Sequence, residues 1–270
     1  MLGDGQAMEH QSITIGPLLR EWRARRRLSQ LDLAHSAEIS PRHMSFIETG
    51  RSLPSREVVL RLAEGLNLNL RNRNALLMAG GYAPGHAERR FDDPALAPAR
   101  EIIQRILDAH MPFPALAVDR HWSLVASNHS VTALLSGVAP HLLDPPVNVL
   151  RLSVHPEGLA GQILNLAEWK RHLIERLHRQ VEASGDHQLE KLAEELKGYP
   201  APASGAPPSD LSAIAVPLVM DSGIGRLSFL STTTMFGTPV EVTLSEIAIE
   251  TFFPADRQTA EALRTLAEAL

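Results

Sequence analysis

The sequence contains no cysteine among its 270 residues. A disulfide framework and a thiolate metal site are therefore excluded, and we expect a cytoplasmic protein that folds in a reducing compartment. Long apolar runs are also missing, because the longest, residues 213–220, is much shorter than a membrane span and contains a proline. Neither a glycine-rich phosphate loop nor a GxSxG or HExxH motif occurs, so the sequence gives no direct sign of a phosphate-binding, esterase or metalloprotease site.

Lysine is missing from the first 82 residues. This part contains eleven arginines against eight acidic residues, whereas residues 83–270 contain fifteen basic and twenty-three acidic residues. The net charge of −5 is therefore divided into +3 and −8. Because local positive charge dominates binding to a phosphate backbone, this division favours a nucleic-acid-binding domain followed by a domain that does not bind nucleic acid. A chance bias in surface charge is the alternative.

Residues 28–68 are predicted to form a helix-turn-helix unit. Ser29 can cap a short helix, with the amide of Gln30 free in its exposed first turn. Ser40 and Pro41 then open a second helix, because serine is a good N-cap and proline is tolerated at the first helical position. This second helix would present small and polar side chains outward, as recognition helices in the major groove of DNA do. A third helix is expected to pack behind the pair.

Several side chains of this unit have the chemistry to contact DNA. Gln30 and Ser40 can donate hydrogen bonds to phosphates, and Arg42 can reach guanine edges. Arg51 and Arg56 flank the second helix at positions that a DNA backbone would pass. The alternative interpretation is an ordinary helical hairpin whose arginines are simply solvated.

Three motifs occur together in this unit, namely Leu28-Ser29-Gln30, Ile47-Glu48-x-Gly50 and Pro54-Ser55. They resemble the lambda-repressor-like domain of the xenobiotic-response-element (XRE) family of bacterial regulators, and the resemblance covers about residues 15–82. It implies an all-α domain of five helices after a flexible arm, residues 1–14, with Glu48 in a structural role. The residues predicted to contact DNA, as phosphate-binding, base-facing or flanking side chains, are Gln30, Ser40, Pro41, Arg42, His43, Ser45, Phe46, Arg51 and Arg56.

The composition changes after a linker, residues 83–98, that is rich in proline, alanine and aspartate. The apolar pattern beyond it predicts an α+β domain with an antiparallel sheet, residues 99–270, that begins like a PAS sensory fold. Helices are expected over residues 101–109, 128–135, 159–181, 186–197 and from 254 onward. Strands are expected over residues 115–119, 122–126, 211–219, 226–235 and 240–252. A change of parity near residues 245–246 predicts a bulge in the last strand.

Further motifs extend across both domains. They are Arg71-Asn72-x-Asn74-Ala75, Gly81-Tyr82-Ala83-Pro84, Asp119-Arg120-x-Trp122, Asn148-x-Leu150-Arg151-Leu152, His155-Pro156, Glu168-Trp169 and Glu250-x-Phe252-x-Pro254. Together they resemble the MmyB-like regulators over nearly the whole of the second domain. The resemblance implies a PAS-like pocket for a small, largely apolar effector, such as a fatty-acid-like acyl chain, and no cofactor.

The resemblance also provides candidate contacts for this effector. For each of them, the alternative is a purely structural role in the core or at the surface, and Asn128 in particular is expected to cap a helix. The candidates are Trp122, Leu124, Asn128, Trp169 and Phe229, with Arg151 and His155 as polar anchors.

Two other functions are open at this level. Asp221-Ser222-Gly223 after an apolar run looks like the catalytic loop of aspartic proteases, which would need a second carboxylate from a dimer partner. A hairpin turn explains the same residues, because this composition is ordinary in turns. The second domain could also dock a protein partner through an exposed apolar patch.

The sequence therefore predicts a bacterial transcription regulator rather than an enzyme. Its partners would be double-stranded operator DNA and a small-molecule effector, with no membrane and no metal involved. We expect a homodimer in which the effector changes the spacing of two recognition helices, and with it the affinity for paired half-sites.

Overall fold

The computed structural model describes residues 14–202 and 216–268. The chain divides into two compact units between Ala87 and Glu88, so the predicted linker, residues 83–98, is shared between them. The first unit is all-α and the second combines helices with an antiparallel sheet, which confirms the predicted fold class. Each unit is described by itself.

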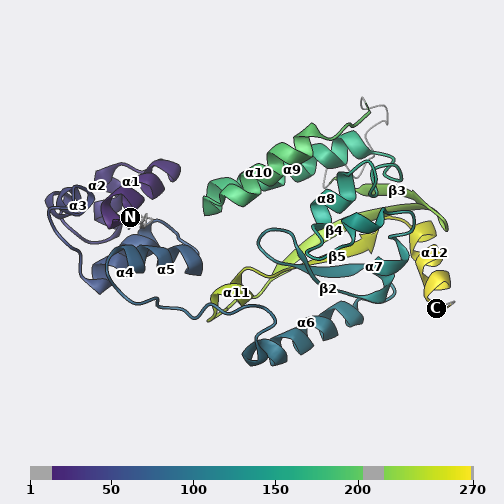
Figure 1. Ribbon diagram of the computed structural model, residues 1–270, viewed down its shortest axis with the longest axis horizontal. Helices are drawn as coiled ribbons and strands as arrows, with labels where there is room; N and C mark the ends of the chain where they lie inside the picture. Colours follow the sequence, from purple (N-terminus) through teal and green to yellow (C-terminus); the bar gives the residue numbers. More distant parts are fainter. Residues whose placement is uncertain (1–13, 203–215, 269–270) are drawn as a thin grey trace, which may run out of the picture. The chain divides into compact units, whose positions relative to one another are not determined.

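From residue 14 onward, the first unit contains five helices, drawn in purple to blue in Figure 1. The side chains of Ser29 and Asp32 form a capping box at the start of α2, and Ser40 caps α3 with Pro41 at the first helical position, as predicted. These caps fix where each helix begins. The helices are α1 (Ile15–Arg25), α2 (Gln30–Ser36), α3 (Pro41–Glu48), α4 (Arg56–Gly65) and α5 (Leu70–Ala79).

The chain that leaves α5 is held by a buried asparagine. The side-chain oxygen of Asn74 accepts hydrogen bonds from the backbone N–H groups of Gly85 (2.9 Å) and His86 (3.0 Å), and its nitrogen donates to the carbonyl of His86 (2.8 Å). The Tyr82 hydroxyl also donates to the carbonyl of Pro54 at 2.8 Å. The first residues of the predicted linker are therefore anchored to the helical unit.

The second unit is built on a five-stranded antiparallel sheet with the strand order β2-β1-β5-β4-β3. The strands are β1 (Ala115–Val118), β2 (Leu124–Ser127), β3 (Leu218–Ser222), β4 (Gly225–Met235) and β5 (Ala248–Pro254). The helices are α6 (Ala97–Ala109), α7 (His129–Ala133), α8 (Val149–Val154), α9 (Leu166–Ser184), α10 (His187–Gly198), α11 (Val242–Ser245) and α12 (Arg257–Glu268), with 3-10 turns η1 (Pro94–Leu96) and η2 (Pro140–Leu142).

Both faces of the sheet are covered by helices. Side chains alternate along a strand, so Ala115 and Ala117 of β1 pack with α6 on one face, whereas Leu116 and Val118 belong to the core beneath α8, α9 and α10 on the other. Figure 1 shows α6 and the α9–α10 pair on opposite sides of the sheet. The larger of these two cores is the one that lies under α9.

Two elements differ from the predicted pattern. The long helix α9 begins at Leu166 rather than at residue 159, because the preceding backbone pairs with the sheet edge: Leu164 N–H donates to Val219 O and Asp221 N–H donates to Gln162 O, both at 2.8 Å. The strand predicted over residues 240–252 is interrupted by α11, which Glu241 caps. The parity change therefore marks a helical turn, and the predicted bulge is wrong.

Other boundaries are shifted. Pro254 ends β5, and the last helix begins three residues later at Arg257. The strand predicted over residues 211–219 begins at Leu218 in the part that the structure describes, and residues 211–215 lie outside it.

Asn128 lies at the junction of α6, β1 and α7 and is 2% exposed. Its side-chain oxygen accepts from Ala115 N–H (3.1 Å), and its nitrogen donates to the carbonyls of Leu107 (3.1 Å) and Phe113 (2.8 Å). Although it occupies the N-cap position of α7, its side chain does not cap the helix, so the predicted capping role is wrong. The amide instead satisfies backbone groups where the chain turns into β1.

We predict that Asn128→Ala lowers the free energy of unfolding by about 2–3 kcal/mol, because three hydrogen bonds to buried or partly buried backbone groups are lost. Urea denaturation followed by circular dichroism measures the change. Gln188→Ala, at an exposed position of α10, is the control and should change stability by less than about 0.5 kcal/mol. Equal stability of the Asn128 variant and the wild type would contradict this structural role.

Candidate DNA interface and ligand cavity

The predicted recognition helix α3 presents one face to solvent. Pro41 and Arg42 are exposed at its N-terminal end, and Phe46 is half-buried one turn further on, with the Arg42 guanidinium 5.3 Å from the centre of its ring. Met44 and Ile47 are fully buried in the core of the unit. The remaining predicted contacts of this region are also accessible, Ser40, Arg51 and Arg56 being exposed and His43 and Ser45 half-buried.

Glu48, at the end of α3, is buried at 3% exposure and joins three helices. Its carboxylate accepts hydrogen bonds from Arg23 of α1 (2.8 Å and 3.2 Å) and from the side-chain nitrogen of Gln30 of α2 (2.9 Å). Arg20 donates to its backbone carbonyl at 2.9 Å. The prediction of a free Gln30 amide is therefore wrong, because the buried carboxylate needs every donor that surrounds it. Glu48 has the structural role that the resemblance implied.

Arginines at the C-terminal end of α1 also bind to groups within the domain. Arg25 pairs with Glu21 at 3.0 Å, and Arg26 donates to the carbonyl of Leu66 at 3.0 Å. Both guanidinium groups lie over the ring of Trp22, at 6.0 Å and 5.5 Å from its centre. These arginines stabilise the α1 surface, so the exposed arginines at α3 and beyond it are the better candidates for DNA contacts.

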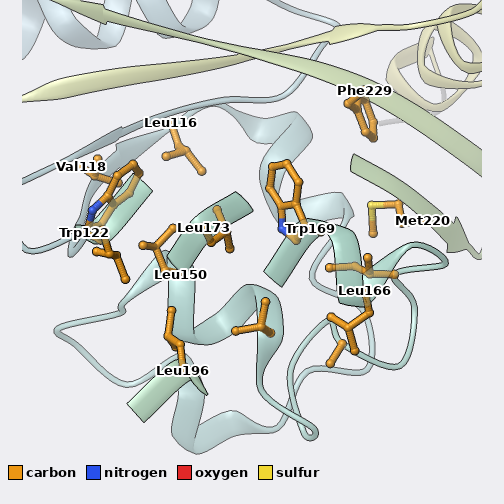
Figure 2. Packing of buried hydrophobic residues seen from close by; sticks show 14 of the residues in the cluster. Leu116, Val118, Trp122, Leu150, Leu166, Trp169, Leu173, Leu196, Met220 and Phe229 are labelled. Carbon is orange, nitrogen blue, oxygen red and sulfur yellow. The ribbon is translucent and has the colours of Figure 1, made fainter. Parts of the chain in front are cut away.

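The second unit contains a partly open cavity of about 350 Å³ between the sheet and α7, α8 and α9. Its walls are almost entirely apolar. Figure 2 shows part of the buried cluster to which these walls belong, with side chains contributed by both the strands and the helices. Among the residues that both line the cavity and are labelled there are Leu116, Trp122, Leu150, Trp169, Leu173, Met220 and Phe229.

Four of the seven predicted effector contacts line this cavity, namely Trp122, Leu124, Trp169 and Phe229. The indole nitrogens of the two tryptophans are already satisfied, since Trp122 donates to the side chain of Gln180 (2.8 Å) and Trp169 to the hydroxyl of Ser153 (2.9 Å). Their rings are thus fixed in orientation. The two tryptophan rings, one from the turn between β1 and β2 and one from α9, therefore form fixed aromatic parts of the cavity wall.

Trp122 reaches the cavity from a turn with unusual backbone geometry. Its φ angle is +66°, a left-handed conformation that bulky residues rarely adopt. The turn is held by the carboxylate of Asp119, which accepts from the backbone N–H groups of His121 and Ser123, both at 2.8 Å. The strained position is consistent with a functional demand on where the indole ring lies.

The other three predicted contacts are not part of the cavity lining. Asn128 satisfies backbone groups, as described above. Arg151 forms a two-point ion pair with Glu195 of α10, with one N–O distance of 2.7 Å, and the Tyr199 hydroxyl donates to the same carboxylate. His155 packs edge-on against Tyr199, with 4.9 Å between ring centres. Arg151 and His155 therefore lie outside the lining of this cavity and connect the end of α8 to α10 and Tyr199.

A buried ion pair in the cavity wall was missed by the sequence reasoning. Glu250 of β5 is 4% exposed, and its carboxylate accepts from Arg176 of α9 at 2.6 Å and 3.1 Å. The Arg176 guanidinium also lies 4.3 Å from the centre of the Trp122 ring. A signal was present: Arg176 continues the inward spacing of Leu166, Trp169 and Leu173 along α9.

His172 neighbours the cavity wall, and its surroundings favour the neutral imidazole. Its ring stacks on Trp169 with 5.6 Å between centres. Burial lowers the pKa of His172, and the positive charges of Arg176 and Arg179 lower this pKa further. The positive charge beside the cavity is therefore that of Arg176 rather than of the imidazole.

The remaining candidate chemistry has structural explanations. Asp221 is exposed at the end of β3, where Ser222 pairs with Gly225 across a hairpin whose glycine has a φ of +108°. This confirms the predicted turn. Within residues 14–202 and 216–268, no three histidine, aspartate or glutamate side chains gather as metal ligands would. In the same ranges no helix is both long and apolar enough to cross a membrane.

An exposed recognition helix in a five-helix domain and an apolar cavity in a second, α+β domain define a DNA-binding transcription regulator with a ligand-binding domain. Comparison with protein families agrees: a helix-turn-helix domain matches residues 14–76, and the MmyB-like transcription regulator ligand binding domain matches residues 99–266. The second match covers more than half of the chain, so the protein belongs to the MmyB-like transcription regulators. Both matched families are regulatory rather than catalytic. No curated protein matches the chain.

We predict that Arg151→Gln lowers the free energy of unfolding by about 1 kcal/mol at neutral pH, because Glu195 loses a partially exposed ion pair. The hydrogen bond from Arg151 holds the pKa of Glu195 below its ordinary value of 4.5. The stabilisation is therefore present above pH 4.5 and lost as the pH falls through the lowered value.

Urea denaturation of the wild type and this variant between about pH 7 and pH 3 measures the difference. The two stabilities should converge in acid. A difference that stays constant across this range would show that Arg151 stabilises the fold without involving the Glu195 charge.

Proposed function

We propose that α3 reads operator DNA and that a small apolar effector bound in the C-terminal cavity regulates this reading within a homodimer. The observation that carries the proposal is the cavity itself, about 350 Å³ of almost wholly apolar space in the domain that accompanies a helix-turn-helix. Cavities of this size are typical of small-molecule sites. A domain that only docked a protein partner would need an apolar surface patch rather than a cavity that reaches into the core.

The DNA-binding part of the proposal rests on the surface of α3. Arg42 is exposed near the helix N-terminus, where recognition helices contact base edges, and its stacking on Phe46 limits its conformations. Ser40, Pro41, His43 and Ser45 provide the small neighbouring groups that allow close approach. Gln30 is held by Glu48, so its side chain would meet a phosphate from a fixed position. Arg51 and Arg56 would contact the backbone on the flanks.

The effector part of the proposal rests on the lining. The aromatic rings of Trp122, Trp169 and Phe229 and the side chain of Leu124 offer dispersion contacts and little hydrogen bonding. Such a lining favours an acyl-chain-like molecule over a sugar or a nucleotide, because a polar ligand would lose its hydration without compensation. No cofactor is needed for this function.

The proposed regulation is thermodynamic linkage. An effector that binds one arrangement of the dimer more tightly than another changes the population of arrangements, and hence the spacing of the two recognition helices. Because half-sites on DNA are separated by about one helical turn or its multiples, a change in spacing alters operator affinity.

We expect Arg42→Ala to lose discrimination at one base pair of the operator by a factor of about 5–100, because a guanidinium contact to a guanine edge is removed. Selection from a random DNA library with the wild-type protein first identifies the preferred sequence. The variant is then measured against this sequence and its single-base changes. Arg257→Ala in α12 is the control and should leave the profile unchanged. An unaltered profile for Arg42→Ala would refute base reading by this residue.

Arg51→Ala is expected to act differently. Loss of a phosphate contact should weaken binding to all sequences alike and reduce the salt dependence of binding by about one counterion. Fluorescence anisotropy at several salt concentrations distinguishes this behaviour from the sequence-dependent loss expected at Arg42. A sequence-dependent loss at Arg51 would argue against its assignment to the backbone.

For the cavity, we predict that Leu124→Trp reduces the affinity for decanol by about tenfold or more, because the larger side chain occupies space that the effector would fill. Isothermal titration measures the affinity, and circular dichroism checks the fold. Leu164→Trp, at a position 51% exposed and outside the cavity lining, is the control. Binding of decanol by both variants with wild-type affinity would place the ligand outside this cavity.

A further inference from the structure

The chemical class of the effector can be inferred from the polar groups in the cavity wall, provided that the cavity binds an effector as proposed above. Among the described residues that line the cavity, the polar side chains other than the tryptophan indoles belong to Ser153, Arg176 and Glu250. Ser153 already accepts the indole N–H of Trp169. The charged groups that an effector would meet are therefore one guanidinium and one carboxylate.

These two groups satisfy each other. Arg176 reaches both carboxylate oxygens of Glu250, at 2.6 Å and 3.1 Å, and both side chains bond to the Thr233 hydroxyl, at 2.6 Å from the arginine and 2.7 Å from the glutamate. The guanidinium face is covered by Trp122. The side chains are 18% and 5% exposed, so little solvent screens the pair. The cluster presents polar atoms to the cavity but has no net charge.

Such a neutral pair resists a charged ligand. An ionised carboxylate could reach Arg176 only by competing with Glu250, and Glu250 would then be left as a buried, unpaired anion next to another anion. A protonated amine could reach Glu250 only by competing with Arg176, and Arg176 would then be left as a buried, unpaired cation next to another cation. An uncharged group faces no such penalty, because it can hydrogen-bond at the edge of the pair while the pair stays intact.

We propose that the cavity selects apolar molecules with an uncharged hydrogen-bonding end group, such as an alcohol or a primary amide, and that the Arg176–Glu250 pair reads this end group. The pair excludes ionised carboxylates and amines of the same chain length. A fatty acid would then enter as its neutral, protonated form. Selectivity thus comes from two opposite charges that cancel, rather than from a single anchoring charge.

The test compares four probes with one chain length, namely decanol, decanamide, decanoate and decylammonium, near pH 7, where the last two are ionised. Competition against a fluorescent apolar probe gives the relative affinities. The wild-type protein should bind the alcohol and the amide about tenfold or more tightly than either ion. Wild-type affinity for decanoate or decylammonium equal to that for decanol would overturn the proposal.

Three variants test the charge logic. Glu250→Gln removes the carboxylate, so decanoate should gain about tenfold or more relative to decanol. The double variant Arg176→Met with Glu250→Met replaces the pair by apolar groups, which avoids leaving a buried charge and keeps the fold measurable. In this double variant, decanamide should no longer bind more tightly than decane, a plain apolar chain. Arg151→Gln, which breaks an ion pair outside the cavity, is the matched control and should preserve the wild-type order.

The outcomes separate this inference from the function on which it rests. If Glu250→Gln still rejects decanoate, or if the double variant keeps the preference for the amide, the pair does not read the end group and this inference fails while effector binding stands. If the folded wild-type protein binds none of the four probes and no decane, the proposed effector function fails, and the inference fails with it.

Discussion

Strand β1 lies inside the C-terminal sheet, where it pairs with β2 on one side and with the middle strand β5 on the other. Because both of its faces are buried, its four residues must fit two different cores at once. Small alanines face α6, whereas the larger Leu116 and Val118 face the core under α9, and Leu116 also lines the cavity. Asn128 fixes the start of this strand, because its side chain bonds to the Ala115 N–H and to the Phe113 carbonyl.

The N-terminal domain depends on one buried carboxylate in a comparable way. The carboxylate of Glu48, at the end of α3, accepts hydrogen bonds from side chains of α1 and α2. The same end of α3 lies so close to α1 that a Cβ on Gly16 would be 2.5 Å from the Glu48 carbonyl oxygen. A wider residue at Gly16 would push the two helices apart. The orientation of the recognition helix is therefore set by interior chemistry rather than by the residues that would touch DNA.

The parts of the structure that sequence reasoning predicted are those whose causes are local. Ser29 and Ser40 cap helices through groups three residues away, and the turn predicted from Asp221-Ser222-Gly223 joins adjacent strands, with Ser222 paired to Gly225. The parts that it missed depend on residues distant in the chain. Arg176 and Glu250 are 74 residues apart, and the start of α9 is moved by the edge of β3. No spacing within a helix reveals such partners, although an arginine on an apolar face indicates that one must exist.

The same distinction explains why some predicted effector contacts lie outside the cavity lining. Arg151 and Asn128 stand in motifs that point to the second domain as a whole, and a motif does not separate residues that build a cavity from residues that face it. Their partners, Glu195 and the carbonyls of Leu107 and Phe113, decide between these roles. Aromatic positions were easier to assign, because large rings that are apolar on two faces usually belong to a core or to the wall of a cavity.

The attachment of the connecting segment at both ends has a mechanical consequence. Asn74 binds the chain at His86, and the carboxylate of Glu241 accepts the backbone N–H of Arg89 at 2.8 Å in the other unit. Three peptide steps separate these two fixed points, which span at most about 11 Å when extended. The chain between these two attachments therefore contains only a handful of rotatable backbone torsions.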